Sequence, residues 1–132
     1  MINSQIPKTD IPSTIKTRLL ELVAKGQELE SLRTKLRLEE ARIAVAVSDE
    51  KNEDGKPLFG NEKARDAETI RRSQESDSCA ALRSNIFAAE YERAAISADI
   101  DELKMNFKIY QFDRELEIAI LKGSEQGREV VG

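Results

Sequence analysis

The chain has no histidine, no tryptophan and a single cysteine among its 132 residues. Without histidine there is no imidazole base to activate a serine or cysteine nucleophile, and no imidazole ligand for a metal. One cysteine cannot build a zinc site or an internal disulfide, and it fits a reducing compartment. We therefore expect no enzyme activity, no catalytic residues, no cofactor and no bound metal.

Long apolar runs and clustered glycines are missing too. No stretch approaches the ~20 apolar residues that span a bilayer. The first residues lack the basic and then apolar order of a signal peptide. The six glycines do not gather into a phosphate-binding loop. These absences predict a cytoplasmic protein with no membrane contact.

Charge is abundant but balanced. Charged residues make up 35% of the chain, and the net charge is −4. Nucleic-acid binders usually carry a basic face, whereas the charge here is spread evenly along the sequence, which argues against a nucleic-acid partner. High charge with few aromatic residues can indicate disorder, but the apolar residues here follow a regular period that favours long helices.

Apolar side chains repeat with a heptad period in both halves of the chain. The first seam comprises Ile15, Leu22, Leu29, Leu36 and Ile43. The second comprises Leu82, Ile86, Ala89, Ile96, Ile100, Leu103, Phe107 and Tyr110. Heptad seams are typical of packed helices. The pattern predicts an all-α fold, a long antiparallel helical hairpin (coiled coil) with unequal arms, assembled into an oligomeric bundle.

Local signals give the boundaries of this hairpin. Ser13 and Asn61 are suitable N-caps, and the Asp54-Gly55 pair favours a turn. The expected segments are an extended N-terminal arm at 1–12, a helical hairpin at 13–122 with helices at 13–51 and 62–121 around a loop at 52–61, and a flexible tail at 123–132. The sequence leaves open whether the loop is a β-hairpin and whether the second helix is continuous through 73–79 and 104–113.

Polar residues that interrupt the seams suggest a register. Antiparallel partners in a hairpin have residue numbers with a constant sum. Arg33 with Asp77 sums to 110 and Glu40 with Arg71 sums to 111, and half of each value falls at the Asp54-Gly55 turn. We expect these two ion pairs to fix the register. The alternative is that the four side chains extend to solvent and pair with nothing.

Gly26 lies inside the first expected helix. A glycine there costs about 1 kcal/mol relative to alanine. In the expected register it lies opposite Ile86, so we expect a close approach between the helices at this point.

The C-terminal part of the second helix is apolar on two opposite faces. A helix of this kind has to be buried on two sides. The N-terminal arm, a fold-back near Asn106 or another subunit could cover it. We favour self-association as a homo-oligomer, with a dimer preferred. The expected association residues are Ile100, Leu103, Met105, Phe107, Ile109, Tyr110, Phe112, Leu116 and Ile120.

The loop offers a second candidate contact, with another protein. The candidate residues at this tip are Lys56, Leu58, Phe59 and Arg65. An exposed phenylalanine ringed by basic groups can dock a partner. The alternative, which we favour, is that Leu58 and Phe59 fold back over the end of the hairpin.

The segment from Asp54 to Arg65, with its D-G-K-P-x-F-x-N-E-x-x-R pattern, resembles a family of uncharacterised small coiled-coil hairpin proteins of phages and bacteria, including cyanobacteria. In that family the segment joins two long helices, so the resemblance implies the same hairpin and no particular activity. A weaker likeness is to phage Gam-type proteins, which are dimers of long helices that bind DNA ends.

These observations predict a non-enzymatic structural or adaptor protein that acts through protein–protein interaction and self-association. The alternative is a DNA-associated accessory protein of the phage or mobile-element type. Salt-sensitive DNA binding distinguishes the two, since phosphate contacts weaken as salt rises.

Overall fold

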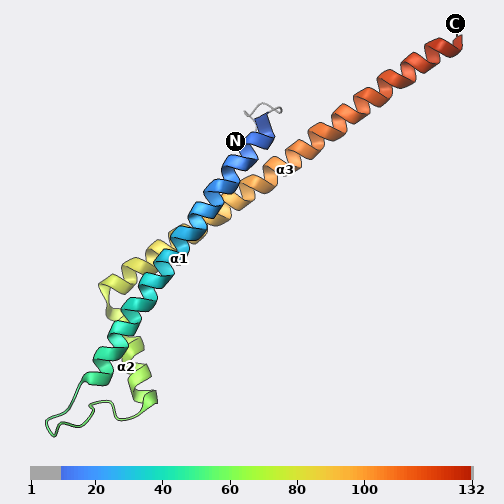
Figure 1. Ribbon diagram of the computed structural model, residues 1–132. Coiled ribbons are helices and arrows are strands. Elements are labelled where there is room, and N and C mark those ends of the chain that lie inside the picture. The colour runs from blue at the N-terminus through green and yellow to red at the C-terminus, as the bar shows by residue number, and fades with distance from the viewer. Residues whose placement is uncertain (1–9, 132) are drawn as a thin grey trace. The chain divides into compact units, whose positions relative to one another are not determined.

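The structure, a computed structural model, describes residues 10–131, with side chains for residues 10–124. It contains three helices, α1 (Ile11–Asp49), α2 (Glu62–Glu75) and α3 (Asp77–Val131), and no strand within the described residues (Figure 1). The expected all-α class is confirmed. The described residues divide into two compact units, 10–23 with 94–131 and 24–93.

Helix α1 begins at Ile11, two residues before the expected start at Ser13. Pro12 lies in the first turn, where its missing N–H would have no intrahelical acceptor and its fixed φ suits the helix. The expected N-cap at Ser13 and the arm boundary at residue 12 are therefore wrong; residues 1–9 lie outside the described part of the chain. The helix ends at Asp49 rather than at Lys51, because Lys51 takes part in pairing within the loop.

Both heptad seams lie on buried faces. All five residues of the first seam are buried or half-buried, and Leu29 keeps only 1% of its surface. All eight residues of the second seam are also buried or half-buried. Some residues of α1 that lie between successive members of the first seam are charged and half-buried, among them Arg18, Lys25 and Glu39. The seam is therefore a narrow apolar stripe bordered by long charged side chains, as expected for packed helices that are open to water on both edges.

The expected second helix, 62–121, is interrupted at Ser76. This residue has φ −72° and ψ 121°, outside the helical region, and separates α2 from α3. Its hydroxyl oxygen accepts a hydrogen bond from the N–H of Cys79 at 3.2 Å, which makes Ser76 the N-cap of α3. Serine is a poor residue for a helix interior because its hydroxyl competes for backbone groups. The sequence has three serines between residues 73 and 78, so one helix ends and the next begins here.

Arg83 ties the two sides of the break together. Its guanidinium donates to the carbonyl oxygen of Ser73 at 3.2 Å and also to the hydroxyl of Ser73. The carbonyl groups of the last turn of a helix have no intrahelical partner, and Ser73 is only 5% exposed. Arg83 therefore satisfies polar groups at the end of α2 that would otherwise be buried without a partner.

The two expected register pairs are wrong. Arg33 forms its ion pair with Glu90 at 3.0 Å, and Glu40 forms its ion pair with Arg83 at 3.5 Å. In both pairs the residue numbers sum to 123. Arg71 instead pairs with Glu68 and Glu75 on its own helix. Asp77 is exposed at the start of α3.

Residues of both α2 and α3 lie beside α1. Glu40 lines a groove with residues of α2, among them Ile70 and Gln74, whose numbers sum with 40 to 110 and 114. The same groove also contains Arg83 of α3, with a sum of 123. The groove alone therefore assigns no register, but the ion pair of Glu50 with Arg72 of α2 sums to 122, close to the 123 of both α3 pairs, so α2 departs from the expected register as α3 does.

Gly26 is not a point of close approach. A Cβ atom added at this glycine would meet nothing within 4 Å. The expected contact with Ile86 depended on a register that the ion pairs of Arg33 and Glu40 overturn, so this expectation is wrong.

Helix α3 continues to Val131 and passes through Gly123 and Gly127. The expected helix end at residue 121 and the flexible tail from residue 123 are therefore wrong as far as the described backbone extends. A glycine weakens a helix by only about 1 kcal/mol and does not stop it, whereas a proline does. No proline follows Pro57 in the sequence.

Candidate interaction surface

Helix α3 carries an exposed apolar face in the first unit. Its five members are Met105, Ile109, Phe112, Leu116 and Ile120, with exposed fractions of 61, 53, 65, 50 and 61%. They recur every three or four residues, a spacing that places them on one side of a helix. All five belong to the expected self-association set. We call them the outer face of α3.

The other four members of that set lie on the opposite side of α3. Ile100 and Leu103 are buried, with exposed fractions of 3% and 0%, and Phe107 and Tyr110 are half-buried. In the same unit Ile11, in the first turn of α1, is 3% exposed. Ile100 and Leu103 therefore belong to the core of the unit and leave no surface for a second copy, so their assignment to self-association is wrong, whereas Phe107 and Tyr110 keep part of their surface.

The exposure extends around α3 towards its C-terminal end. Every residue from Gln111 to Ser124 is exposed. This stretch includes Ile118 and Leu121, which continue the buried side of α3 but keep 44% and 64% of their surface. Large apolar side chains exposed together on one element usually mark an interaction site.

Charged residues border one edge of the outer face. Asp101, Lys108, Glu115 and Lys122 follow one another at intervals of seven residues, with alternating sign, and all four are exposed. Within the part of the chain that has described side chains, none of them takes part in an ion pair. Nearby, Arg114 pairs with Glu117 of its own helix at 3.4 Å. The four charges are therefore available to a partner that approaches the outer face.

The loop between α1 and α2 is held by a minimal antiparallel pairing. Lys51 and Pro57 form an isolated bridge, and it is flanked by hydrogen bonds from the N–H of Asn52 to the carbonyl of Lys56 and from the N–H of Leu58 to the carbonyl of Glu50, both 2.8 Å long. Gly55 closes the turn with φ +77°. The sequence leaves open whether this loop is a β-hairpin. Within the described residues the loop has one isolated bridge and no strand.

The residues after the turn fix the loop to α2. The side chain of Asn61 accepts a hydrogen bond from the N–H of Ala64 at 2.8 Å and caps α2, as expected. Arg65 donates to the carbonyl of Phe59 at 3.3 Å, and the guanidinium of Arg72 lies 5.8 Å from the centre of the Phe59 ring. The D-G-K-P-x-F-x-N-E-x-x-R segment thus contains the residues that close the loop.

These contacts divide the candidate tip residues. Phe59 and Arg65 are half-buried and are used within the loop. Lys56 and Leu58 are exposed, Leu58 with 52% of its surface. A protein partner at the tip would therefore meet Leu58 and Lys56 and not the ring of Phe59.

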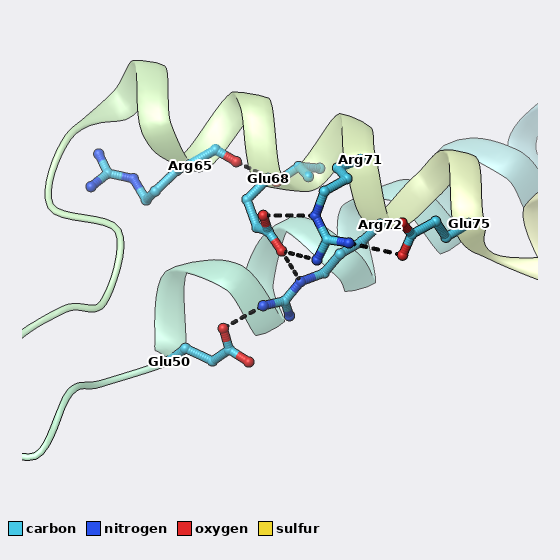
Figure 2. A network of polar contacts seen from close by, with 7 residues as sticks. Glu50, Arg65, Glu68, Arg71, Arg72 and Glu75 are labelled. Carbon is cyan, nitrogen blue, oxygen red and sulfur yellow. Dashed lines mark hydrogen bonds and ion pairs between the residues drawn. The ribbon is translucent and has the colours of Figure 1, made fainter.

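An ion-pair network connects the end of α1 to α2 (Figure 2). Arg72 pairs with Glu50 and, at 2.9 Å, with Glu68. Glu68 also pairs with Arg71, which pairs in turn with Glu75 at 2.9 Å. Hydrogen bonds from Arg71 and Arg72 lower the pKa of Glu68 from 4.5 to about 2. The same contact raises the pKa of Arg71.

Part of this network could have been found from the sequence. Glu68 lies three and four residues before Arg71 and Arg72, a spacing that brings side chains together on a helix. The contact between Glu50 and Arg72 joins residues 22 positions apart. No local pattern indicates this contact, nor the contact of Arg83 with Ser73 across the break.

Comparisons with family models, curated proteins and solved structures give no significant match for this chain. Among the described residues, no helix is both long enough and apolar enough to cross a membrane.

Proposed function

We propose that the chain is a non-enzymatic structural or adaptor protein that self-associates through the outer face of α3 and presents its loop to another protein. The observation that carries the proposal is the exposure of five large apolar side chains in a row, each with half or more of its surface in water.

The energetic argument is that such a face is unfavourable in water. Burial of one large apolar side chain contributes about 1.5–3 kcal/mol. Single exposed apolar residues are normal on protein surfaces, but a continuous stripe marks an interface. The opposite side of α3 already packs within the unit at Ile100 and Leu103. The outer face can therefore be covered by a second copy without disturbing that packing.

Light scattering after size-exclusion chromatography tests the proposal. The wild-type protein is expected to show twice the 14.8 kDa mass of one chain. The variant Phe112→Glu/Leu116→Glu, which puts two charges into the outer face, is expected to be monomeric with unchanged helical content by circular dichroism.

A matched control adds the same two charges outside the outer face. Gln111→Glu/Ser124→Glu changes exposed residues that are not part of the stripe, and this variant should keep the wild-type mass. A wild-type protein that remains monomeric at high concentration would show that the proposed self-association is wrong.

A further inference from the structure

Given the proposed self-association, the charges along the outer face indicate how two copies are oriented. Asp101, Lys108, Glu115 and Lys122 lie seven residues apart on one edge of this face. Residues seven apart occupy the same position of successive heptads. In an antiparallel pair of helices each such edge lies against the same edge of the other copy. A row of charges that alternates in sign can therefore be complementary to itself.

We propose that two copies of α3 associate antiparallel, with the two-fold axis close to residue 111. In this register Lys108 lies opposite Glu115 of the second copy, and Asp101 lies opposite Lys122 of the second copy. Both pairs of residue numbers sum to 223, and the symmetry repeats each pair, so that four ion pairs border the interface.

The same register matches the apolar residues. In an antiparallel coiled coil, the residue numbers of two facing core residues add up to two less than those of two facing edge residues. Since the edge pairs here sum to 223, the core pairs sum to 221. Ile109 then lies opposite Phe112 of the second copy, and Met105 lies opposite Leu116 of the second copy. Four of the five outer-face residues thus meet one another in pairs across the axis, and large side chains fill the centre of the interface.

Other registers bring like charges together. A shift of one heptad in one direction places Lys108 opposite Lys122 and Glu115 opposite its own copy. A shift in the other direction places Lys108 opposite its own copy and Asp101 opposite Glu115. Like charges directly opposed in an interface are destabilising, and such pairs select the register in coiled coils. The alternation therefore excludes the two nearest competing registers.

A parallel arrangement is disfavoured by Glu102. This residue lies on the outer face one turn before Met105, at a core position of the heptad pattern. In a parallel pair it would oppose its own copy in the seam, with two carboxylates removed from water together, which is costly. In the antiparallel register it lies opposite Ala119 of the second copy, whose small side chain leaves space for the carboxylate to reach solvent.

The orientation is tested by charge reversal. Dimer dissociation constants are measured by sedimentation equilibrium for the wild type, Lys108→Glu, Glu115→Lys and the double variant. Each single change turns two attractive pairs into repulsive ones, and since exposed pairs are individually weak, we expect dissociation constants on the order of tenfold higher. The double variant should return close to the wild-type value. An equimolar mixture of the two single variants should associate more tightly than either variant alone.

A parallel dimer would give a different pattern. There Lys108 would face Asp113 of the second copy, and Glu115 would face Ile120. Glu115→Lys would then have little effect, and the double variant would stay as weak as Lys108→Glu. This result would overturn the orientation and leave the proposed self-association intact, whereas a monomeric wild type would overturn both.

A distance measurement gives an independent readout. Cys79 is fully buried, so a spin label can be directed to the exposed position 124 with Ser124→Cys. The antiparallel register places the two labels about 40 Å apart along the helix axes, at 1.5 Å per residue. A parallel dimer would place them within about 15 Å, since helix axes lie 8–10 Å apart, and this result would refute the proposal.

Discussion

Replacement of glycine by alanine should have opposite effects at two positions of this chain, Gly26 and Gly55. Gly26 lies inside α1, and an added Cβ atom would meet nothing within 4 Å. Gly55 lies in the loop with φ +77°, and there too an added Cβ atom would meet nothing within 4 Å. Steric clash with neighbours is absent at both positions, so the comparison isolates the backbone.

The expected magnitudes follow from the two backbone conformations. Alanine is more favourable than glycine in a helix interior by about 0.8–1 kcal/mol, so Gly26→Ala should raise the free energy of unfolding by about that amount. An L-residue in the left-handed region is less favourable by about 1–2 kcal/mol, so Gly55→Ala should lower the free energy of unfolding by about that amount. The melting temperature should move by a few degrees in opposite directions.

Urea unfolding followed by circular dichroism measures both changes, at one fixed protein concentration because association also affects stability. The double variant should lie near the sum of the two single changes, since the two sites are distant from each other. A destabilising effect of Gly26→Ala would refute the reasoning, because it would mean that another helix or a second copy approaches this glycine closely.

Two further predictions concern the polar contacts within 24–93. Arg83→Met leaves the carbonyl and hydroxyl of Ser73 without their donor, so it should destabilise the protein by about 2 kcal/mol in urea unfolding, whereas Arg93→Met, at an exposed arginine outside any ion pair in the described part of the chain, should have little effect. Addition of Ser73→Ala to Arg83→Met should then cost less than Ser73→Ala costs in the wild type, and additive effects would contradict the contact. Because folding lowers the pKa of Glu68 from 4.5 to about 2, Glu68 stabilises the protein fully above its unfolded pKa, and this contribution is lost as the pH falls through about 2. The difference in melting temperature between the wild type and Glu68→Gln should therefore be constant at neutral pH and disappear near pH 2, and a difference that persists there would argue against the ion pairs of Glu68.

Several features of the candidate surface could be predicted because they depend on local chemistry. The alternation of apolar residues along α3 places Met105 and Phe112 on one side and Leu103 and Phe107 on the other, whatever the rest of the chain does. The sequence could not say which side was already covered. That depends on which face of α3 packs against α1, and the association set expected from the sequence therefore combines buried residues such as Leu103 with exposed ones such as Phe112.

The loop also combines features that local chemistry predicts with a contact that it does not predict. Asn61 as N-cap and Gly55 in the turn follow from the conformations that these residues favour. The placement of Phe59 beneath Arg72 depends on a residue 13 positions further along the chain, which the helix α2 carries back to the loop. The segment that the sequence suggests as a docking surface therefore mainly holds the loop closed.

The sequence by itself determined that the chain forms long helices, which faces of them are apolar and where the chain turns, because helical period, capping and left-handed backbone are properties of a few neighbouring residues. Only the tertiary structure decided the register, with Arg33 on Glu90 and Glu40 on Arg83. A heptad pattern is satisfied equally well after a shift of whole heptads, so local rules do not distinguish the alternatives. The contacts between distant residues select one of them, and Glu50 with Arg72 of α2 sums to 122, in agreement with the two pairs of α3.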